Sequence, residues 1–283
     1  MTHYNWLEAI NITEEMVMKT ETNRRLPVIW ISALDCTGCK EAFTRSFEPT
    51  MLDTILNFIS LEYSELLSLA SGEQIEAHKE SIFAEYKGEY ILAIEGSIPR
   101  RDDFLLIAGK SVREEIRRAS RNAKAVIAIG SCSAWGGIPA AGINPTDSVD
   151  IKTMIPEDVP LVLVPGCPPI PEAIIGTFLH VHFHGVLPEL DKKNRPKIYY
   201  QKTVHMTCHR KPFFDQKLFA ESYDDEGAKK GYCLFKLGCK GPSAFNACES
   251  IGYDRCIAAG FPCIGCSEKG FWDKGGFVAR RKK

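Results

Sequence analysis

The cysteine content is the feature that most restricts how this chain can fold. Eleven cysteines occur in 283 residues, and an odd number of thiols cannot all pair as disulfides. The pairs Cys36-Thr-Gly-Cys39 and Cys263-Ile-Gly-Cys266 have the short spacing that is typical of metal or redox sites in intracellular proteins. A disulfide-stabilised scaffold is a poor interpretation, because 45% of the residues are hydrophobic and can form a core.

The number of potential ligands favours iron–sulfur clusters. A cluster of the 4Fe-4S type takes four protein ligands, usually thiolates, with histidine as an occasional substitute. His205 lies three positions before Cys208, and its imidazole raises the number of ligands to twelve, enough for three such clusters. A chain in which every thiol binds iron is expected to carry electrons. Zinc also binds sets of thiolates and is the alternative.

Composition and charge exclude several classes of partner. The formal net charge of -1 gives no reason to expect binding to nucleic acid or to an anionic membrane. No run of 18 apolar residues is present, so we expect no transmembrane segment in this chain. Acidic residues interrupt the first 25 residues, which lack the apolar segment of a signal peptide. This predicts a cytoplasmic location, or a periplasmic one if a twin-arginine leader has been removed.

Four short apolar runs predict a parallel sheet. They are rich in Val and Ile without clean alternation, as in strands buried on both faces: residues 26–34, 90–94, 125–129 and 160–164. Helical patterns fall between and after them, over residues 49–69, 109–120 and 170–184. The alternation predicts an α/β fold with a flavodoxin-like, doubly wound parallel-sheet domain at residues 26–190. Residues 1–25 are then an N-terminal extension.

The remainder of the chain, residues 191–283, has a different character. It holds seven cysteines with many glycines and aromatic residues and little periodic apolar pattern. Such a segment buries too little surface to fold by itself, so bound metal is expected to organise it. We therefore predict a smaller, irregular iron–sulfur cluster domain after the sheet domain.

The first ligand set follows the predicted strands. Cys36 and Cys39 come after the first strand, Cys132 after the third and Cys167 after the fourth. Ligands of open parallel sheets bind beyond the carboxyl ends of the strands, so these four thiols can converge on one cluster. A redox disulfide between Cys36 and Cys39 would leave Cys132 and Cys167 without a role.

The remaining ligands divide into two further sets. One set contains the histidine and comprises His205, Cys208, Cys233 and Cys239. A neutral imidazole ligand suits a more exposed cluster, because it leaves less negative charge on the site. The other is built around the last Cys-x-x-Cys pair and comprises Cys248, Cys256, Cys263 and Cys266. His205 could instead be a polar loop residue, and Cys256 could be a buried free thiol.

The motifs occur in an order that resembles the small subunit of nickel–iron hydrogenases. They are Cys-Thr-Gly-Cys, Gly-Ser-Cys-Ser-Ala-Trp-Gly-Gly, Val-Pro-Gly-Cys-Pro-Pro, His-x-x-Cys, Leu-Gly-Cys-Lys-Gly-Pro and Pro-Cys-Ile-Gly-Cys-Ser-Glu, and the resemblance covers residues 26–273. It implies that the first set binds a proximal cluster and the histidine-containing set a distal cluster. Cys248, Cys263 and Cys266 match the ligands of a medial cluster.

The resemblance also implies a function and partners. Such a subunit belongs to a hydrogen:acceptor oxidoreductase, whose nickel–iron centre lies in a separate large subunit and catalyses H2 ⇌ 2H⁺ + 2e⁻. This chain would relay the electrons to a carrier such as a cytochrome or a ferredoxin. We expect an obligate heterodimer with the large subunit, which could also assemble as a dimer of heterodimers.

Two departures from the family pattern matter. Most such subunits have proline at the position of Cys256 and a medial cluster of three irons. A cysteine there resembles the nickel–iron–selenium branch and predicts a medial 4Fe-4S cluster, or a 3Fe-4S cluster if Cys256 is not a ligand. Oxygen-tolerant relatives carry two additional cysteines at the positions of Gly38 and Gly137. Glycine at both predicts an ordinary proximal cluster.

Thr37 matches a family threonine that faces the large subunit near its proton exit. It is a candidate proton relay, or its hydroxyl only caps the cluster loop.

Three rival functions share parts of the pattern. A hydrogen-sensing regulatory hydrogenase would use the same clusters, and the cluster-binding subunit of respiratory complex I shares only the first domain. A zinc-organised interaction module is the option without redox chemistry.

Overall fold

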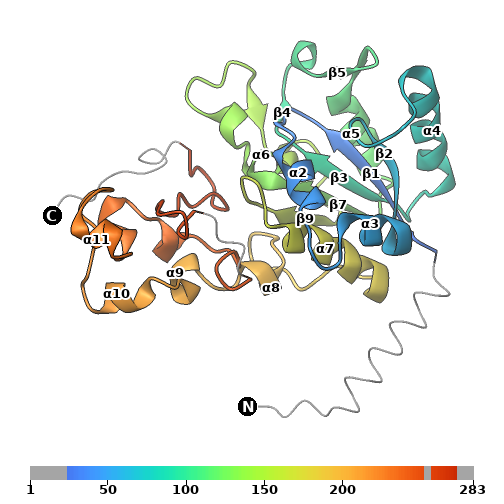
Figure 1. The fold of residues 1–283 in the computed structure, drawn as a ribbon. Helices are drawn as coiled ribbons and strands as arrows, with labels where there is room; N and C mark the ends of the chain where they lie inside the picture. Colours follow the sequence, from blue (N-terminus) through green and yellow to red (C-terminus); the bar gives the residue numbers. More distant parts are fainter. Residues whose placement is uncertain (1–23, 252–255, 273–283) are drawn as a thin grey trace, which may run out of the picture.

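A parallel sheet of five strands forms the centre of the fold (Figure 1). The computed structural model describes residues 24–251 and 256–272, so most of the N-terminal extension and the last residues of the chain lie outside it. The strands run in the order β2-β1-β3-β7-β9, which is the flavodoxin-like, doubly wound order and confirms the predicted fold class. They are β1 (Leu26–Ser32), β2 (Ile59–Ser64), β3 (Ile91–Glu95), β7 (Ala125–Ile129) and β9 (Leu161–Val164).

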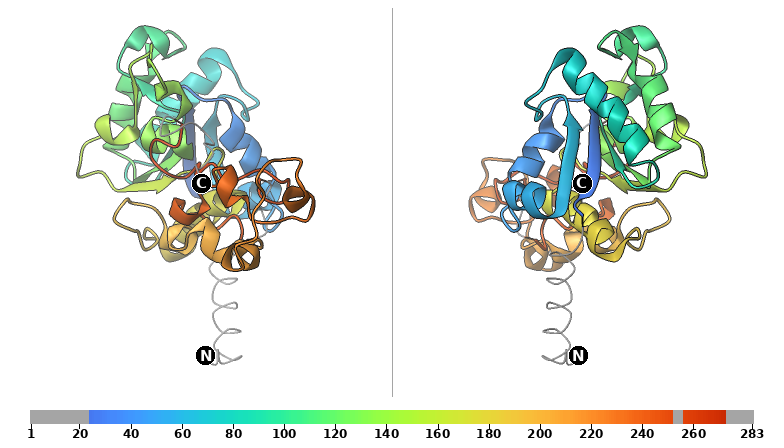
Figure 2. Two further views of the ribbon diagram at one scale, coloured as in Figure 1. Left: turned by 90° about the vertical axis from the view of Figure 1, so that its left-hand side faces the viewer. Right: turned by 90° about the vertical axis from the view of Figure 1, so that its right-hand side faces the viewer.

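Helices cover both faces of the sheet (Figures 1 and 2). Val28 and Trp30 of β1 face α2 (Gly38–Thr44) and α7 (Pro171–His184), where the indole lies 5.5 Å from the ring of Phe43. Ile29 and Ile31 face the opposite core, which is covered by α4 (Gly72–Glu85) and α5 (Val112–Ser120). Because both faces are buried, the strands show no polar alternation in the sequence.

The predicted helix at residues 49–69 is wrong in its second half. The chain forms a short helix, α3 (Met51–Asp53), and a π-helical turn, η1 (Thr54–Phe58), before it enters β2. Helical spacing of the apolar residues therefore holds only as far as Phe58. Beyond it, parallel pairing with β1, from Leu26 opposite Ile59 to Trp30 opposite Ser64, overrides the local pattern.

Short elements surround the carboxyl edge of the sheet and make up the C-terminal part. They are α6 (Gly130–Trp135), β4 (Ile98–Pro99) paired with β8 (Ser148–Val149), β5 (Leu106–Ile107) paired with β6 (Lys110–Ser111), α8 (Lys197–Tyr200), α9 (Val204–Thr207), α10 (Lys211–Asp215) and α11 (Glu226–Lys229). The C-terminal part is irregular, as expected, and its own apolar core is small. The domain boundary at residue 190 stays a prediction. Among the described residues, none of the helices is both long enough and apolar enough to span a bilayer.

One buried ion-pair network ties the helices of one face together. The ammonium of Lys79 is fully buried and lies 2.9 Å from a carboxylate oxygen of Glu76 and 2.9 Å from one of Glu115. The hydroxyl of Tyr63 in β2 donates to the other oxygen of Glu76 at 2.9 Å. Lys79 therefore links α4, α5 and the edge strand through one positive charge.

Replacing Lys79 by methionine should destabilise the protein strongly, because two carboxylates then stay buried without their cation. The free energy of unfolding should fall by about 3–5 kcal/mol. This loss should appear as a lower midpoint of thermal unfolding of the anaerobically purified protein. Lys229→Met is the control, since Lys229 is 65% exposed and its pairing with Glu226 contributes little. Equal midpoints for the two variants would contradict the structural role of Lys79.

Candidate iron–sulfur sites

The structure brings the first four predicted thiols together at the carboxyl edge of the sheet. Cys36 follows β1, Cys39 lies in the first turn of α2, Cys132 lies in α6 after β7, and Cys167 follows β9. Burial, then Glu95 and the other three thiols, raise the pKa of Cys39 well above its usual value. Burial likewise raises the pKa of Cys132 to about 12, with contributions from Cys167 and Cys36. The four thiols therefore lie close together, with Cys39 buried, Cys132 half-buried, and Cys36 and Cys167 exposed.

Two glycines leave the space that a cluster at this position needs. At Gly130, where φ is +87°, an added Cβ would lie 2.6 Å from the Sγ of Cys39. At Gly137 it would lie 2.5 Å from the Sγ of Cys132. Any larger residue would push a ligand sulfur aside. Four convergent thiols with no oxygen donor among them are suited to an iron–sulfur cluster, so the residues fit the group that the family implies.

A buried carboxylate anchors the Cys39 loop, and sequence reasoning missed the cation that holds it. The amide of Cys39 donates to Glu95 at 2.9 Å, and the ammonium of Lys40 lies 3.1 Å from the other Glu95 oxygen. Lys40 also donates to the hydroxyl of Ser32 at 2.5 Å. Burial and the charge of Glu95 raise the pKa of nearby Asp35, while Lys40 opposes them. The only signal in the sequence was a lysine next to a ligand cysteine.

Thr37 occupies the turn between the two ligands of this loop. Its backbone is left-handed, with φ 66°, and its carbonyl accepts the amide of Glu41 at 3.0 Å. Its hydroxyl makes no capping hydrogen bond to α2, so the capping alternative finds no support at that helix. The proton-relay role stays a prediction.

The structure places the last four cysteines around one cavity. Cys248, Cys256, Cys263 and Cys266 line a space of about 260 Å³, together with Cys167 of the first set. Burial, and after it the charge of Cys266, raises the pKa of Cys263. Cys256 is exposed and not buried, so the alternative of a buried free thiol is wrong.

The histidine-containing set lines a second, smaller cavity. His205, Cys208, Cys233 and Cys239 all contribute to its wall. Burial raises the pKa of Cys208 to about 12, while Cys239 and Cys233 act in the same direction. The imidazole of His205 packs edge-on against Phe214 with 4.5 Å between ring centres, and burial lowers its pKa. The lowered pKa favours the neutral imidazole, which is the form that binds a metal.

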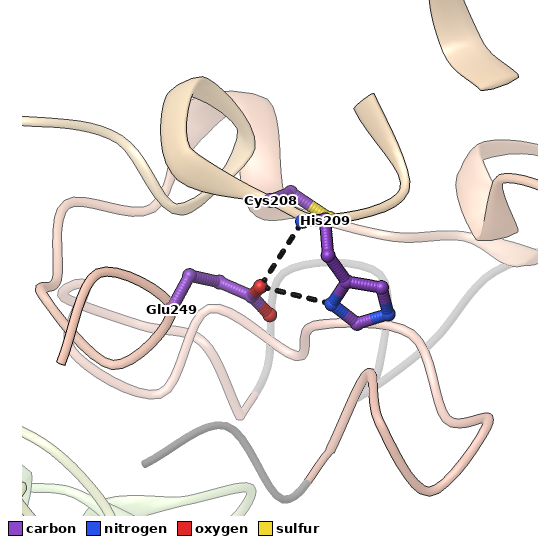
Figure 3. A group of neighbouring side chains, drawn as sticks. All are labelled: Cys208, His209 and Glu249. Atoms are coloured by element: carbon purple, nitrogen blue, oxygen red, sulfur yellow. Dashed lines mark hydrogen bonds and ion pairs between the residues drawn. The ribbon is translucent and has the colours of Figure 1, made fainter. Parts of the chain in front are cut away.

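A second histidine lies close to this set but points to a different partner (Figure 3). Ligand atoms of Cys208, His209 and Glu249 lie within 4.8 Å of one another. The Nδ1 of His209 is 3.2 Å from the Glu249 carboxylate, which also accepts the His209 amide at 3.3 Å. His209 is not part of the cavity wall, whereas His205 is. The geometry thus favours His205 as the fourth ligand.

Shared wall residues connect the three sites in sequence. Cys167 belongs to the first ligand set and also lines the cavity of the Cys248 set. Val204 and Ile257 line both that cavity and the one at His205. The Cys248 set therefore lies between the other two. Three adjoining soft-ligand sites at the end of a flavodoxin-like sheet are suited to iron–sulfur clusters, the cofactors of one class of electron-transfer proteins.

Two family models match consecutive parts of the chain. The model described as NADH ubiquinone oxidoreductase, 20 Kd subunit, matches residues 36–181. The model for the C-terminal part of the NiFe/NiFeSe hydrogenase small subunit matches residues 200–278. The second match covers the segment that the related subunit of respiratory complex I lacks, which excludes that rival.

Whole-chain comparisons identify the family. The uptake hydrogenase small subunit of Azotobacter vinelandii is 49% identical over 266 residues, which are 92% of this chain and 74% of the relative. That of Afipia carboxidovorans is 46% identical, over 95% of this chain and 74% of the relative. The reduced, active Ni-Fe-Se hydrogenase from Desulfomicrobium baculatum includes a chain that is 32% identical, with a TM-score of 0.83 over 91% of this chain and 100% of that chain. This chain belongs to the family of nickel–iron hydrogenase small subunits. It is thus one subunit of an oxidoreductase and pairs with a large subunit.

Replacing Gly130 by alanine should remove the proximal cluster, because the new Cβ would lie only 2.6 Å from the Cys39 sulfur and would push it aside. We expect a loss of about four irons per heterodimer, measured by metal analysis. Gly88→Ala is a matched control: Gly88 has a φ of +82°, close to the +87° of Gly130, but its added Cβ meets nothing within 4 Å. Full iron content in Gly130→Ala would show that the cluster does not need the space left at Gly130.

Proposed function

We propose that this chain is the electron-relay subunit of an uptake-type nickel–iron hydrogenase. Electrons from H2 ⇌ 2H⁺ + 2e⁻ at the large-subunit nickel–iron site would pass through three 4Fe-4S clusters to an external acceptor. The observation that carries the proposal is the arrangement of twelve ligands around three adjoining sites with shared walls. The names of the closely similar relatives support the direction of H2 oxidation.

The chain's own contribution is to hold each cluster and to set its potential. A cluster of this type takes up and releases one electron at a time. Backbone amides two residues after a ligand donate to its sulfur, each at 3.4 Å, from Arg210 to Cys208, from Gly241 to Cys239 and from Gly265 to Cys263. Hydrogen bonds to ligand sulfurs stabilise the more negative, reduced cluster and so raise its potential.

The medial site is proposed to hold four irons. Cys256 lies in the wall of the same cavity as Cys248, Cys263 and Cys266, so a fourth thiol is available to the fourth iron. Its charge also contributes to the raised pKa of Cys266, which reaches about 12 mainly through burial. All three clusters would then be of one type.

Partner surfaces are proposed at the two ends of the relay. Phe47 and Ile143 are 86% and 93% exposed and belong to the loops that follow α2 and α6 beside the proximal ligands, a position suited to the large subunit. At the other end, Met206 is 60% exposed next to His205. A carrier such as a ferredoxin or a cytochrome would accept electrons there. A dimer of heterodimers and a cytoplasmic location stay predictions.

Anaerobically purified heterodimer should contain about twelve irons and as much acid-labile sulfide in the small subunit, in addition to the metals of the large subunit. Three cubanes would colour the protein brown. Elemental analysis and the visible spectrum check this together. A colourless preparation, or one in which zinc replaces iron, would contradict the electron-relay function.

Replacing Cys256 by alanine should convert the medial cluster to a three-iron cluster, because one iron loses its protein ligand. The expected result is a loss of about one iron and the appearance of a three-iron EPR signal in the oxidised protein. Ser250→Ala, at an exposed serine near the same ligand set, should show neither change. A strong three-iron signal in the unaltered protein would show that Cys256 is not a ligand.

A further inference from the structure

Arg210 is a buried cation in the wall of the distal cavity. Its side chain is 92% buried, being only 8% exposed, and lies beside Cys208 and Cys233. Nη1 donates to the carbonyl of Tyr232 at 3.0 Å and Nη2 to that of Ile257 at 2.9 Å. The buried Nε has no hydrogen-bond partner, and in the described part of the chain no carboxylate lies within ion-pair distance of the guanidinium.

This arrangement differs from that of the cations around it. Lys211 is paired with Asp215 at 2.6 Å and Lys229 with Glu226 at 3.0 Å, both on the surface. A guanidinium stays protonated at any physiological pH, and burying its charge without an anion is costly. Two neutral carbonyls fix its position but do not balance its charge. An anion is therefore expected next to the Nε of Arg210, which has no hydrogen-bond partner.

The ligand set of the same cavity is the candidate for that anion. The backbone amide of Arg210 donates to the Sγ of Cys208 at 3.4 Å, and Arg210 lines the cavity together with Cys208 and Cys233. The carbonyl that accepts Nη2 belongs to Ile257, which lines the same cavity as the ligand set. Three thiolates with one neutral imidazole give the distal cluster a net negative charge, and each reduction adds to it.

We propose that Arg210 is the fixed counter-charge of the distal cluster, holding its positive charge against the ligand set and raising the cluster's reduction potential. The inference rests on the proposed function, because it requires a cluster at His205, Cys208, Cys233 and Cys239. A permanent positive charge in a poorly hydrated wall favours the more negative, reduced state. Arg210 acts through the cluster and is a positioning residue, without contact to the hydrogen-converting site.

The test is an EPR-monitored redox titration of the distal cluster in the anaerobically purified heterodimer. Arg210→Gln should lower the distal potential by about 59 mV or more, the one-electron equivalent of a tenfold change in the reduction equilibrium. Arg210→Lys, which keeps the charge, should shift it much less. Lys217→Met removes an exposed cation outside the cavity wall and should leave the potential unchanged, because solvent screens it.

The outcomes separate this inference from the proposed function. A complete distal cluster in the unaltered protein with an unchanged potential in Arg210→Gln would overturn the counter-charge alone. The counter-charge inference is also overturned if Lys217→Met, or the charge-retaining Arg210→Lys, shifts the potential as far as Arg210→Gln does. Should the glutamine variant lose the distal cluster, Arg210→Lys decides: retention at the original potential supports the inference, and loss overturns it. If the unaltered protein has no distal cluster, the proposed three-cluster relay is wrong, and the inference about Arg210 falls with it.

Discussion

The carboxyl edge of the parallel sheet is the constraint on which the rest of the structure depends. The loops after β1, β7 and β9 end there, and they carry all four proximal thiols. The C-terminal part packs against the same edge through Ser131, whose hydroxyl donates to the Cys266 carbonyl and accepts the Gly166 amide at 2.9 Å. Trp135 adds a hydrogen bond from its indole to the Ser267 carbonyl at 3.1 Å. The edge thus places the second ligand cavity next to the first.

Burial of the thiols links metal binding to folding in the C-terminal part. Its own apolar core is a small group around Val204, Leu234 and Ile257, and four of the cysteines pack against it. Burial raises the pKa of Cys263 and Cys266, so without metal these side chains are neutral thiols in the interior. Bound iron stabilises the thiolate form instead, and its binding energy adds to the stability of a segment that lacks regular structure.

The sequence predicted the sheet and the ligand groups because both depend on residue type. Buried parallel strands need continuous apolar runs, and iron needs thiolates, so four of the five strands and the grouping of the candidate ligands around three sites could be inferred. The strand β2 could not, since its pairing with β1 is a tertiary interaction that competes with a helical pattern. Lys40 and Arg210 were also beyond reach. Lysine and arginine normally lie at the surface, and only the folded structure shows that these two are buried.

The charges buried beside the ligands differ between the two ends of the relay. At the proximal end the carboxylate of Glu95 raises the pKa of Cys39, after burial, and so disfavours added negative charge. At the distal end Arg210 acts in the opposite direction on the pKa of Cys233, although Glu249 partly offsets it at Cys208. A neutral imidazole ligand makes the distal set less negative still. The charge of Glu95 is balanced by Lys40 at 3.1 Å, whereas no carboxylate among the described residues lies within ion-pair distance of Arg210. In the proposed relay, this unbalanced positive charge of Arg210 would favour an electron at the distal end, away from the large subunit, which is the direction that H2 oxidation requires.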